Sequence, residues 1–362
     1  MEQEIELTEQ QVAINQNKCS GCGANMVFDI ESGGLKCRHC GSKQEFNDTE
    51  SVERRRLCDE LLRTHKPWTD GKVFQCSNCG AKEVLEIKSI ARKCAFCGSA
   101  QIIEINELPG IQPDSVIPFQ VTEAAATERF RKWIRARWMA PAAFRRSSDM
   151  REHMNKLYTP CWSFSARTTN QYSGTVGRTV HTQVRTRNGV QTRSHVRWFR
   201  VSGMIGADYN DHMYQSGDRI NSRNFNGLKP FDLKQLRVYR QEYLSGIIAE
   251  HYSRTLEQCF NEFSNFVRRD VQNRIIRKHR ADTVSHMDIQ TTFNDRRFNY
   301  VLLPIYISHY TYKGKLFNFF INGATGKVVG RYPRSKWKIF GIVLGVLAVV
   351  AGAGVAVYFL MS

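Results

Sequence analysis

The chain has 362 residues, with 52 Lys and Arg against 34 Asp and Glu, which gives a formal net charge of +18. A hydrophobic fraction of 41% is typical of folded protein and excludes a chain that is disordered throughout. At about 100 to 200 residues per domain, the length allows two or three domains. The positive charge favours an anionic partner. Nucleic acid, anionic lipid headgroups and an acidic protein surface all fit it.

Residues 1–17 are polar, and we predict a flexible N-terminus there. Eight cysteines follow in two clusters, each with the pattern C-x2-C, a gap of 14 residues and C-x2-C. Every cysteine of the first cluster recurs 57 positions later in the second, which indicates an internal duplication. The candidate metal ligands are Cys19, Cys22, Cys37, Cys40, Cys76, Cys79, Cys94 and Cys97.

The spacing of these cysteines is typical of metal binding. Two residues between cysteines let a tight turn aim both sulfurs at one ion, and a glycine after the pair accepts the backbone conformation of that turn. We therefore predict two zinc ribbons, over residues 18–46 and 71–106, with one Zn2+ in each. Iron in a rubredoxin-like site is the competing metal. A catalytic zinc is disfavoured, because four thiolates leave no open coordination position.

A linking helix is expected between the ribbons, within residues 47–70. Val52, Leu57 and Leu61 have near-helical spacing there. Cys58 falls in this segment, and we interpret it as a spectator thiol rather than a ninth ligand.

Prolines and a glycine in residues 107–120 indicate a linker and a domain boundary. An α+β cytosolic domain with an antiparallel sheet is expected over residues 121–332. Thr122 is a suitable N-cap for its first helix, which should run to about Met139 with an aromatic stripe facing the core.

From Tyr158 the pattern becomes that of strands, and Asn188-Gly189 is a hairpin signal. Arginines recur through this region with almost no acids among them, and their alternation predicts that several share one sheet face. The candidate patch for an anionic partner consists of Arg167, Arg178, Arg185, Arg187, Arg193, Arg197 and Arg200. A solvated face without a binding role is the alternative. Cys161 lies in an apolar strand, where a spectator thiol is expected.

Two helices are expected next, over residues 231–254 and 256–280, followed by a β-meander over residues 300–332. No sequence motif of a catalytic site occurs. The segment Gly323–Lys327 resembles a phosphate-binding loop, but its glycines are too close together, and Val328 stands where Ser or Thr would bind magnesium.

Residues 339–361 contain no charged side chain. A helix of that length reaches about 34 Å and would cross a hydrocarbon core of about 30 Å. We therefore predict a single C-terminal transmembrane helix, preceded by a basic collar at residues 333–338. Cations before the span favour a single-pass protein with its N-terminal body in the cytoplasm and its C-terminus at the outer face. Gly341 and Gly345 offer a small-residue ridge for a homodimer within the membrane.

The two ribbons occur together with several more specific segments, among them Ile117–Phe119, Tyr158–Trp162, Leu303–Tyr306 and Asn322–Gly326. This combination resembles the bacterial membrane-anchored double zinc-ribbon proteins related to Bacillus YdjG, also described as TFIIB-type or primosomal protein N′-like. The resemblance implies recruitment of cytosolic partner proteins of the SPFH and PspA type at the membrane. Only the eight ribbon cysteines carry over as site residues. The replication label is weakened, because a helicase needs a phosphate-binding loop.

These features predict a multidomain α+β protein with two tandem four-cysteine zinc ribbons, a mixed α/β-strand cytosolic domain and one transmembrane helix. The expected function is that of a non-enzymatic membrane-anchored adaptor that recruits or scaffolds partner proteins, in a membrane-stress response. The alternative is a nucleic-acid-binding protein linked to DNA replication, which would bind through the ribbons and the arginine-rich sheet. The roles of Cys58, Cys161 and Cys259 and the oligomeric state stay open.

Overall fold

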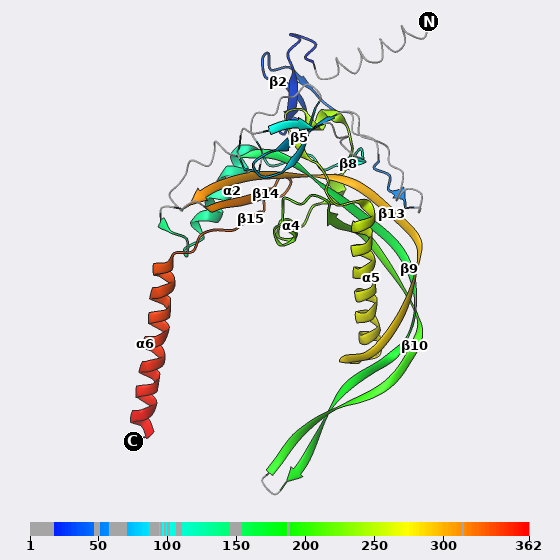
Figure 1. Cartoon of the computed structure of the whole chain (residues 1–362), viewed down its shortest axis with the longest axis vertical. Helices are drawn as coiled ribbons and strands as arrows, with labels where there is room; N and C mark the ends of the chain where they lie inside the picture. Colours follow the sequence, from blue (N-terminus) through cyan, green and yellow to red (C-terminus); the bar gives the residue numbers. More distant parts are fainter. Residues whose placement is uncertain are drawn as a thin grey trace.

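The computed structural model describes residues 18–46, 51–57, 71–86, 94, 96–97, 99, 102–105, 111–142, 144, 154–186, 189–312 and 315–361. An arched body carries two long projections on one side, a β-hairpin and helix α6 (Lys336–Met361) (Figure 1). The first cysteine cluster lies at the opposite side of the body, where strand β2 (Gly34–Cys37) is labelled (Figure 1).

Three long strands form the spine of the arch: β9 (Asn155–Thr186), β10 (Gly189–Gln215) and β13 (Thr283–Tyr312). β9 lies between the other two and pairs antiparallel with both. The main path of the sheet has the order β11-β8-β13-β9-β12-β6-β5-β7, and β10 joins it through β9. The strong strand pattern after Tyr158 is thus confirmed, and the strands are much longer than a typical strand of five or six residues.

Shorter strands complete this sheet: β4 (Arg55–Arg56), β5 (Gly71–Cys76), β6 (Lys82–Glu86), β7 (Ile102–Ile105), β8 (Ser115–Val116), β11 (Arg237–Val238), β12 (Ile248–Glu250), β14 (Lys315–Asn322) and β15 (Val328–Gly330). A separate small sheet contains β1 (Met26–Asp29), β2 and β3 (Lys43–Gln44). The two cysteine clusters therefore differ in context. The strands of the second belong to the large sheet, whereas those of the first form a sheet of their own.

Helix α5 (Leu256–Lys278) packs against the three long strands (Figure 1). Its N-terminus has a capping box, in which Thr255 Oγ1 accepts from the Gln258 amide at 3.2 Å and Gln258 Oε1 accepts from the Thr255 amide at 3.0 Å. Such a cap contributes about 1 kcal/mol. Buried side chains recur every three or four residues along the helix, at Leu256, Cys259, Phe263, Val267, Val271 and Ile275. The predicted amphipathic helix is confirmed, and it provides one side of a large core cluster.

Helix α2 (Glu123–Arg135) starts at the predicted N-cap, because the Thr122 hydroxyl accepts from the Ala125 amide. Phe130 and Ile134 are buried in the core, as predicted. The helix ends before the expected residue Met139, however, and Trp138 is exposed.

Residues 231–254 do not form the expected helix. The structure has two 3-10 turns there, η2 (Leu233–Gln235) and η3 (Gln241–Leu244), and the short strands β11 and β12. Gly246 has a φ of +77°, a left-handed conformation that interrupts a helix. Its neighbours Tyr243, Leu244 and Ile247 are nevertheless buried, so tertiary packing dominates over their helical spacing. The sequence also did not predict helix α4 (Ser222–Leu228).

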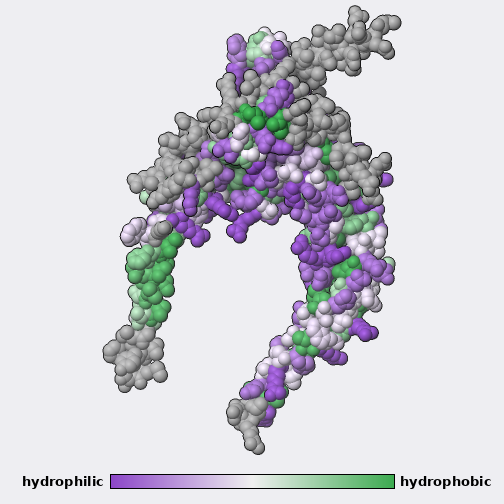
Figure 2. Space-filling model, in the orientation of Figure 1, coloured by the Kyte–Doolittle hydropathy of each residue, from purple (hydrophilic) through white to green (hydrophobic). Residues whose placement is uncertain are grey.

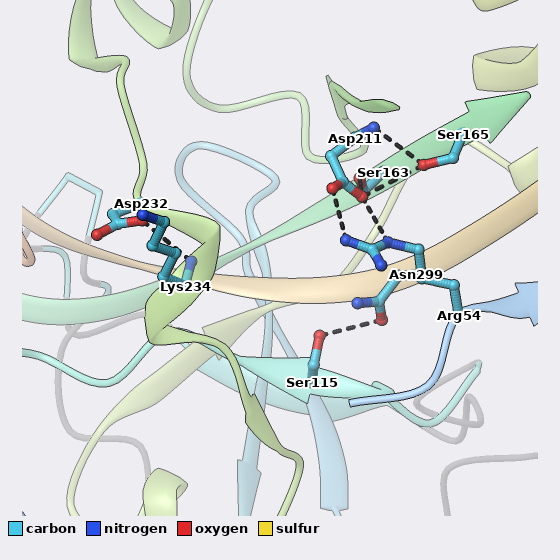
Figure 3. A network of polar contacts seen from close by, with 8 residues as sticks. All are labelled: Arg54, Ser115, Ser163, Ser165, Asp211, Asp232, Lys234 and Asn299. Carbon is cyan, nitrogen blue, oxygen red and sulfur yellow. Dashed lines mark hydrogen bonds and ion pairs between the residues drawn. The ribbon is translucent and has the colours of Figure 1, made fainter. Parts of the chain in front are cut away.

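The expected linking helix between the ribbons also differs from the structure. Residues 51–57 contain strand β4, which pairs with β13, and the other parts of that segment, Cys58 included, lie outside the described residues. Arg54 donates to both carboxylate oxygens of Asp211 in β10, at 2.7 and 2.6 Å (Figure 3). Asp211 lies in a β-bulge with a φ of +53° and its amide donates to Ser165 Oγ at 2.9 Å. This contact therefore holds the 51–57 segment at the bend of the long hairpin.

The C-terminal helix α6 projects from the body, and its described side chains form an apolar surface (Figure 2). Among the described residues, no helix is both long and apolar enough to span a membrane. The predicted transmembrane helix over residues 339–361 is corrected accordingly. The single-pass placement with a cytoplasmic body and an outer C-terminus is not supported either.

Candidate metal centres and the basic arm

Each cysteine cluster brings its four sulfurs together. The Sγ atoms of a cluster all lie within 4.8 Å of one another. The closest Sγ pairs are 3.3 and 3.5 Å apart in the first cluster and 3.7 Å apart in the second. A tetrahedral shell with Zn–S bonds of about 2.3 Å separates its sulfurs by about 3.8 Å, so the donor set fits zinc. The grouping joins Cys19, Cys22, Cys37 and Cys40 in one site and Cys76, Cys79, Cys94 and Cys97 in the other.

The backbone around the cysteines repeats between the two clusters. The Cys19 amide donates to Ala24 O at 2.9 Å, and the Gly23 amide donates back to Cys19 O at 2.8 Å. The same two bonds recur in the second cluster. The Cys76 amide donates to Ala81 O at 2.9 Å, and the Gly80 amide donates to Cys76 O at 2.8 Å. The glycines after three of the four cysteine pairs, Gly23, Gly41 and Gly80, have left-handed φ angles of 69 to 78°. The fourth, Gly98, lies outside the described residues. These are the predicted tight turns between paired cysteines, which we call knuckles. A bound zinc ion would crosslink the two knuckles of each cluster.

The first ribbon contacts the body along one edge. Phe28 and Phe46 pack on Tyr243, with ring centroids 5.5 and 5.0 Å from it. The Phe28 amide also donates to Ser245 O at 3.1 Å. Cys22 and Cys40 are exposed at the metal end of this ribbon. The first cysteine cluster therefore has an exposed end, on a module that packs on the body through Phe28 and Phe46.

The second ribbon is built into the body. Its strand β6 pairs with β12, and Cys76 and Cys94 are buried in a core cluster shared with the long strands. Arg219 from outside the ribbon donates to Cys79 O at 2.8 Å. A metal ion at this site would stabilise the body as well as the ribbon.

A buried carboxylate lies next to the second ribbon. Glu250 of β12 is directly opposite Glu83 of β6, and both are buried. Thr159 Oγ1 donates to Glu250 Oε2 at 2.6 Å, and the Arg219 amide donates to Glu250 Oε1 at 3.3 Å. Burial raises the pKa of Glu250 to about 7 in spite of these bonds. Sequence reasoning missed this group, because it becomes buried only when β12 pairs with β6.

The predicted arginine patch is divided. Register places Arg178, Arg193 and Arg197 on one face of the β9–β10 hairpin, and Arg185 and Arg200 on the other. Arg167 lies nearer the body and pairs with Asp208 at 3.3 Å. Arg187 is outside the described residues. The expectation that several arginines share one sheet face thus holds for three of them.

The outer part of the hairpin has no third strand among the described residues. Pairing of β13 with β9 ends at Gly177, opposite Trp198 of β10. We call the two-stranded part beyond this point, residues 177–186 and 189–198, the arm. No Asp or Glu occurs in residues 168–207. The arm is therefore a basic ribbon that projects away from the body (Figure 1).

The face of the arm opposite Arg193 and Arg197 is partly apolar. Val190, Val196 and Trp198 are exposed, and their even spacing along β10 places them on one face. The exposed fraction of Trp198 is 48%. The arm thus has a basic face and, on its opposite side, a face with exposed apolar side chains.

The two other cysteines in the described part of the chain, Cys161 and Cys259, are not candidate nucleophiles. Cys161 is fully buried in β9, and burial raises the pKa of its thiol. Burial likewise raises the pKa of Cys259, on α5, to about 11. Both thiols remain protonated near neutral pH, which is typical of spectator cysteines in a core.

Comparison with known proteins gives one informative similarity. No family model matches the chain, and no solved structure matches it. The chain is 29% identical over 326 residues to a Bacillus subtilis (strain 168) protein described as the uncharacterized protein YdjG, a match that covers 89% of this chain and 91% of that protein. The chain is thus similar to YdjG over most of its length, and its two four-cysteine groups are compatible with zinc ribbons.

Proposed function

We propose that the chain is a non-catalytic adaptor of the double zinc-ribbon type, in which the arm and the first ribbon bind partner proteins. The observation that carries the proposal is the arm. An isolated two-stranded ribbon is marginally stable in water. The exposed Val190, Val196 and Trp198 on one face of the arm add an unfavourable contact with solvent, which a partner would remove.

The chemistry of the arm indicates the kind of partner. Its apolar face has Trp198 next to Val196, and exposed aromatic residues are frequent anchors of protein interfaces. On its basic face, the strand register places Arg178 directly opposite Arg197. An acidic protein with a partly apolar surface would suit both faces. Proteins of the SPFH and PspA type, which the resemblance to double zinc-ribbon proteins implies, are the first candidates.

The first ribbon supports the same function. It contacts the body along one edge and exposes the knuckles of Cys22 and Cys40 together with Arg38 and His39. A rigid module held in this way can present its metal end to a partner without rearrangement of the body. The second ribbon, by contrast, serves as a structural part of the large sheet.

Photocrosslinking from the arm tests the proposal. A benzoylphenylalanine in place of Trp198 should crosslink to a defined partner protein in cells, and Arg193→Glu with Arg197→Glu should reduce the yield severalfold. Trp138 is the matched control, because it is an exposed tryptophan, at 59%, on the body. Equal crosslinking from the two positions would contradict binding through the arm. Recovery of the same partners by Cys19→Ser as by the wild type would contradict docking through the first ribbon.

The basic face of the arm also favours a second function, nucleic-acid binding. Two-stranded ribbons of this kind enter the grooves of DNA in some protein families, and the six arginines of residues 168–207, without an acid among them, would attract phosphates. Binding through phosphate contacts should weaken steeply with salt. Lack of affinity for single- and double-stranded nucleic acid at about 50 mM salt, measured by fluorescence anisotropy, would exclude this function.

A further inference from the structure

A cavity of about 870 Å³ lies between the end of β10, helix α4 with the loop that follows it, and helix α5. This volume is in the range of sites for small molecules, about 300 to 1,000 Å³. The inner side of the arch, where α4 and α5 lie, has a largely hydrophilic surface (Figures 1 and 2). Neither the ribbons nor the arm contribute residues to the cavity, so it is a separate site.

Positive charge predominates in the cavity. Its cationic side chains are Lys229 from the loop after α4, Arg254 before α5, and Arg268 and Arg269 on α5. Glu262 is the one acidic residue that lines it, and it pairs with Arg254 at 2.5 Å. The lining therefore carries an excess of positive charge, which favours an anionic ligand.

A bound anion would stabilise the charged form of Lys229. Its ammonium group donates to Met213 O at 3.3 Å and lies 5.3 Å from the centre of the Phe225 ring. Burial lowers the pKa of Lys229, because loss of water disfavours the charged form. A negative group in the cavity would compensate this loss of hydration.

Gln215, at the end of β10, provides an independent indication of a ligand. Its side chain is buried and lines the cavity, and Nε2 has no hydrogen-bond acceptor among the described residues. An unsatisfied buried donor costs about 1 to 3 kcal/mol. A ligand oxygen would satisfy this donor. The cavity thus offers donors from Gln215, Lys229 and the arginines, which matches a ligand rich in acceptors.

Aromatic side chains form another part of the lining. Phe225 and Phe266 come from α4 and α5, and His212 packs on Phe266 with ring centroids 4.7 Å apart. Tyr214 of β10 lines the same cavity. Aromatic faces close to arginines are suited to stack a planar ring while the cations bind an attached phosphate.

We propose that this cavity binds a phosphorylated small molecule with a planar ring, the nucleotide class, with its phosphate at Lys229, Arg268 and Arg269. Gln215 donates to an oxygen of the ligand, and Phe266, which is only half-buried, contacts the ring. The proposal does not depend on the adaptor function, because a ligand here could regulate or stabilise the chain whichever partner the arm binds.

Calorimetric titration of the full chain tests this site with AMP, ATP, adenosine and inorganic phosphate. AMP and ATP should bind, and adenosine and phosphate should each bind at least about tenfold more weakly, since each lacks one half of the recognised chemistry. Arg268→Glu with Arg269→Glu should reduce nucleotide affinity at least about tenfold. Both side chains are exposed, so the variant should keep its fold, as checked by circular dichroism. Gln215→Leu should also weaken binding.

Two controls give the assay its specificity. Arg277→Glu changes an exposed arginine on the same helix outside the cavity, and Arg193→Glu with Arg197→Glu changes the arm. Both should keep the affinity of the wild type. Absence of nucleotide binding, or unchanged affinity in the Arg268 and Arg269 variant, would overturn the proposal. Loss of binding in the arm variant would place the nucleotide elsewhere and would also overturn the proposal. Equal affinity for AMP and phosphate would overturn recognition of the ring.

Discussion

At the residue scale, single side chains in this protein have roles that depend on long-range pairing. Glu250 is an example, because it is buried by the pairing of β12 with β6 and β9. Thr159 and the Arg219 amide satisfy its oxygens, but they do not outweigh the loss of hydration. Such a carboxyl group couples the stability of the body to pH.

The sign of this coupling follows from the direction of the shift. The pKa of Glu250 is raised from 4.5 to about 7, so the folded state binds the proton more tightly than the unfolded state. The contribution of Glu250 to stability is therefore complete below pH 4.5 and is lost as pH rises through about 7. Glu250→Gln should flatten this decrease. Free energies of unfolding from urea titrations between pH 5 and 8 would measure it, and a wild type and variant with parallel pH profiles would contradict the raised pKa.

Gly246 illustrates a backbone requirement. Its φ is +77°, and a Cβ there would meet Val27 of the first ribbon at 3.3 Å. Gly246→Ala should destabilise the protein by about 1 kcal/mol through the left-handed conformation alone. Gly206→Ala is a suitable control, because a Cβ there has only an ordinary contact at 3.8 Å. Thermal unfolding followed by circular dichroism compares the two, and equal melting temperatures would contradict the prediction.

At the element scale, the duplicated ribbons have diverged in their attachment. The knuckles are alike, with the same hydrogen bonds around Cys19 and Cys76. The first ribbon forms its own sheet, and the second extends the large sheet through β6. Loss of metal should therefore have different consequences at the two sites.

Substitution of one ligand in each ribbon tests this difference. Cys19→Ser should remove one zinc ion and leave the melting temperature of the body nearly unchanged. Cys76→Ser should remove the other and lower that temperature by several degrees, because Cys76 is buried in the core shared with the long strands. Mass spectrometry measures the zinc content of each variant, and calorimetry measures its melting temperature. Equal destabilisation by the two variants would show that the ribbons are equally integrated.

The sequence predicted those elements whose signals are local. The cysteine spacing located both four-cysteine groups, the N-cap Thr122 of α2 was recognisable, and Asn188-Gly189 indicated the hairpin. Residues 231–254 were misassigned, because the burial of Tyr243 and Ile247 comes from tertiary contacts and not from a helical face. The fusion of the second ribbon to the body depends on β6 pairing with β12, elements far apart in the sequence. The division of the arginines between two faces required the register of β9 and β10.

At the scale of the whole molecule, the arm is an appendage of the body and not part of its core. Beyond Gly177 β9 has no described partner strand other than β10, and most of its side chains there are exposed. Replacement of residues 180–195 by a short Asn-Gly turn should leave the thermal stability of the body nearly unchanged and abolish capture of the partner. Differential scanning calorimetry and the crosslinking assay measure the two effects. A large loss of stability would contradict an arm without a structural role.

The length of β9 has a geometric consequence. This one strand of 32 residues runs from the tip of the hairpin to its parallel pairing with β12, and β12 pairs in turn with β6 of the second ribbon. The strand is thus continuous from the hairpin tip to the sheet of the second ribbon. A partner bound at the tip of the hairpin would therefore lie about 100 Å along this strand from the sheet that contains the second cysteine cluster.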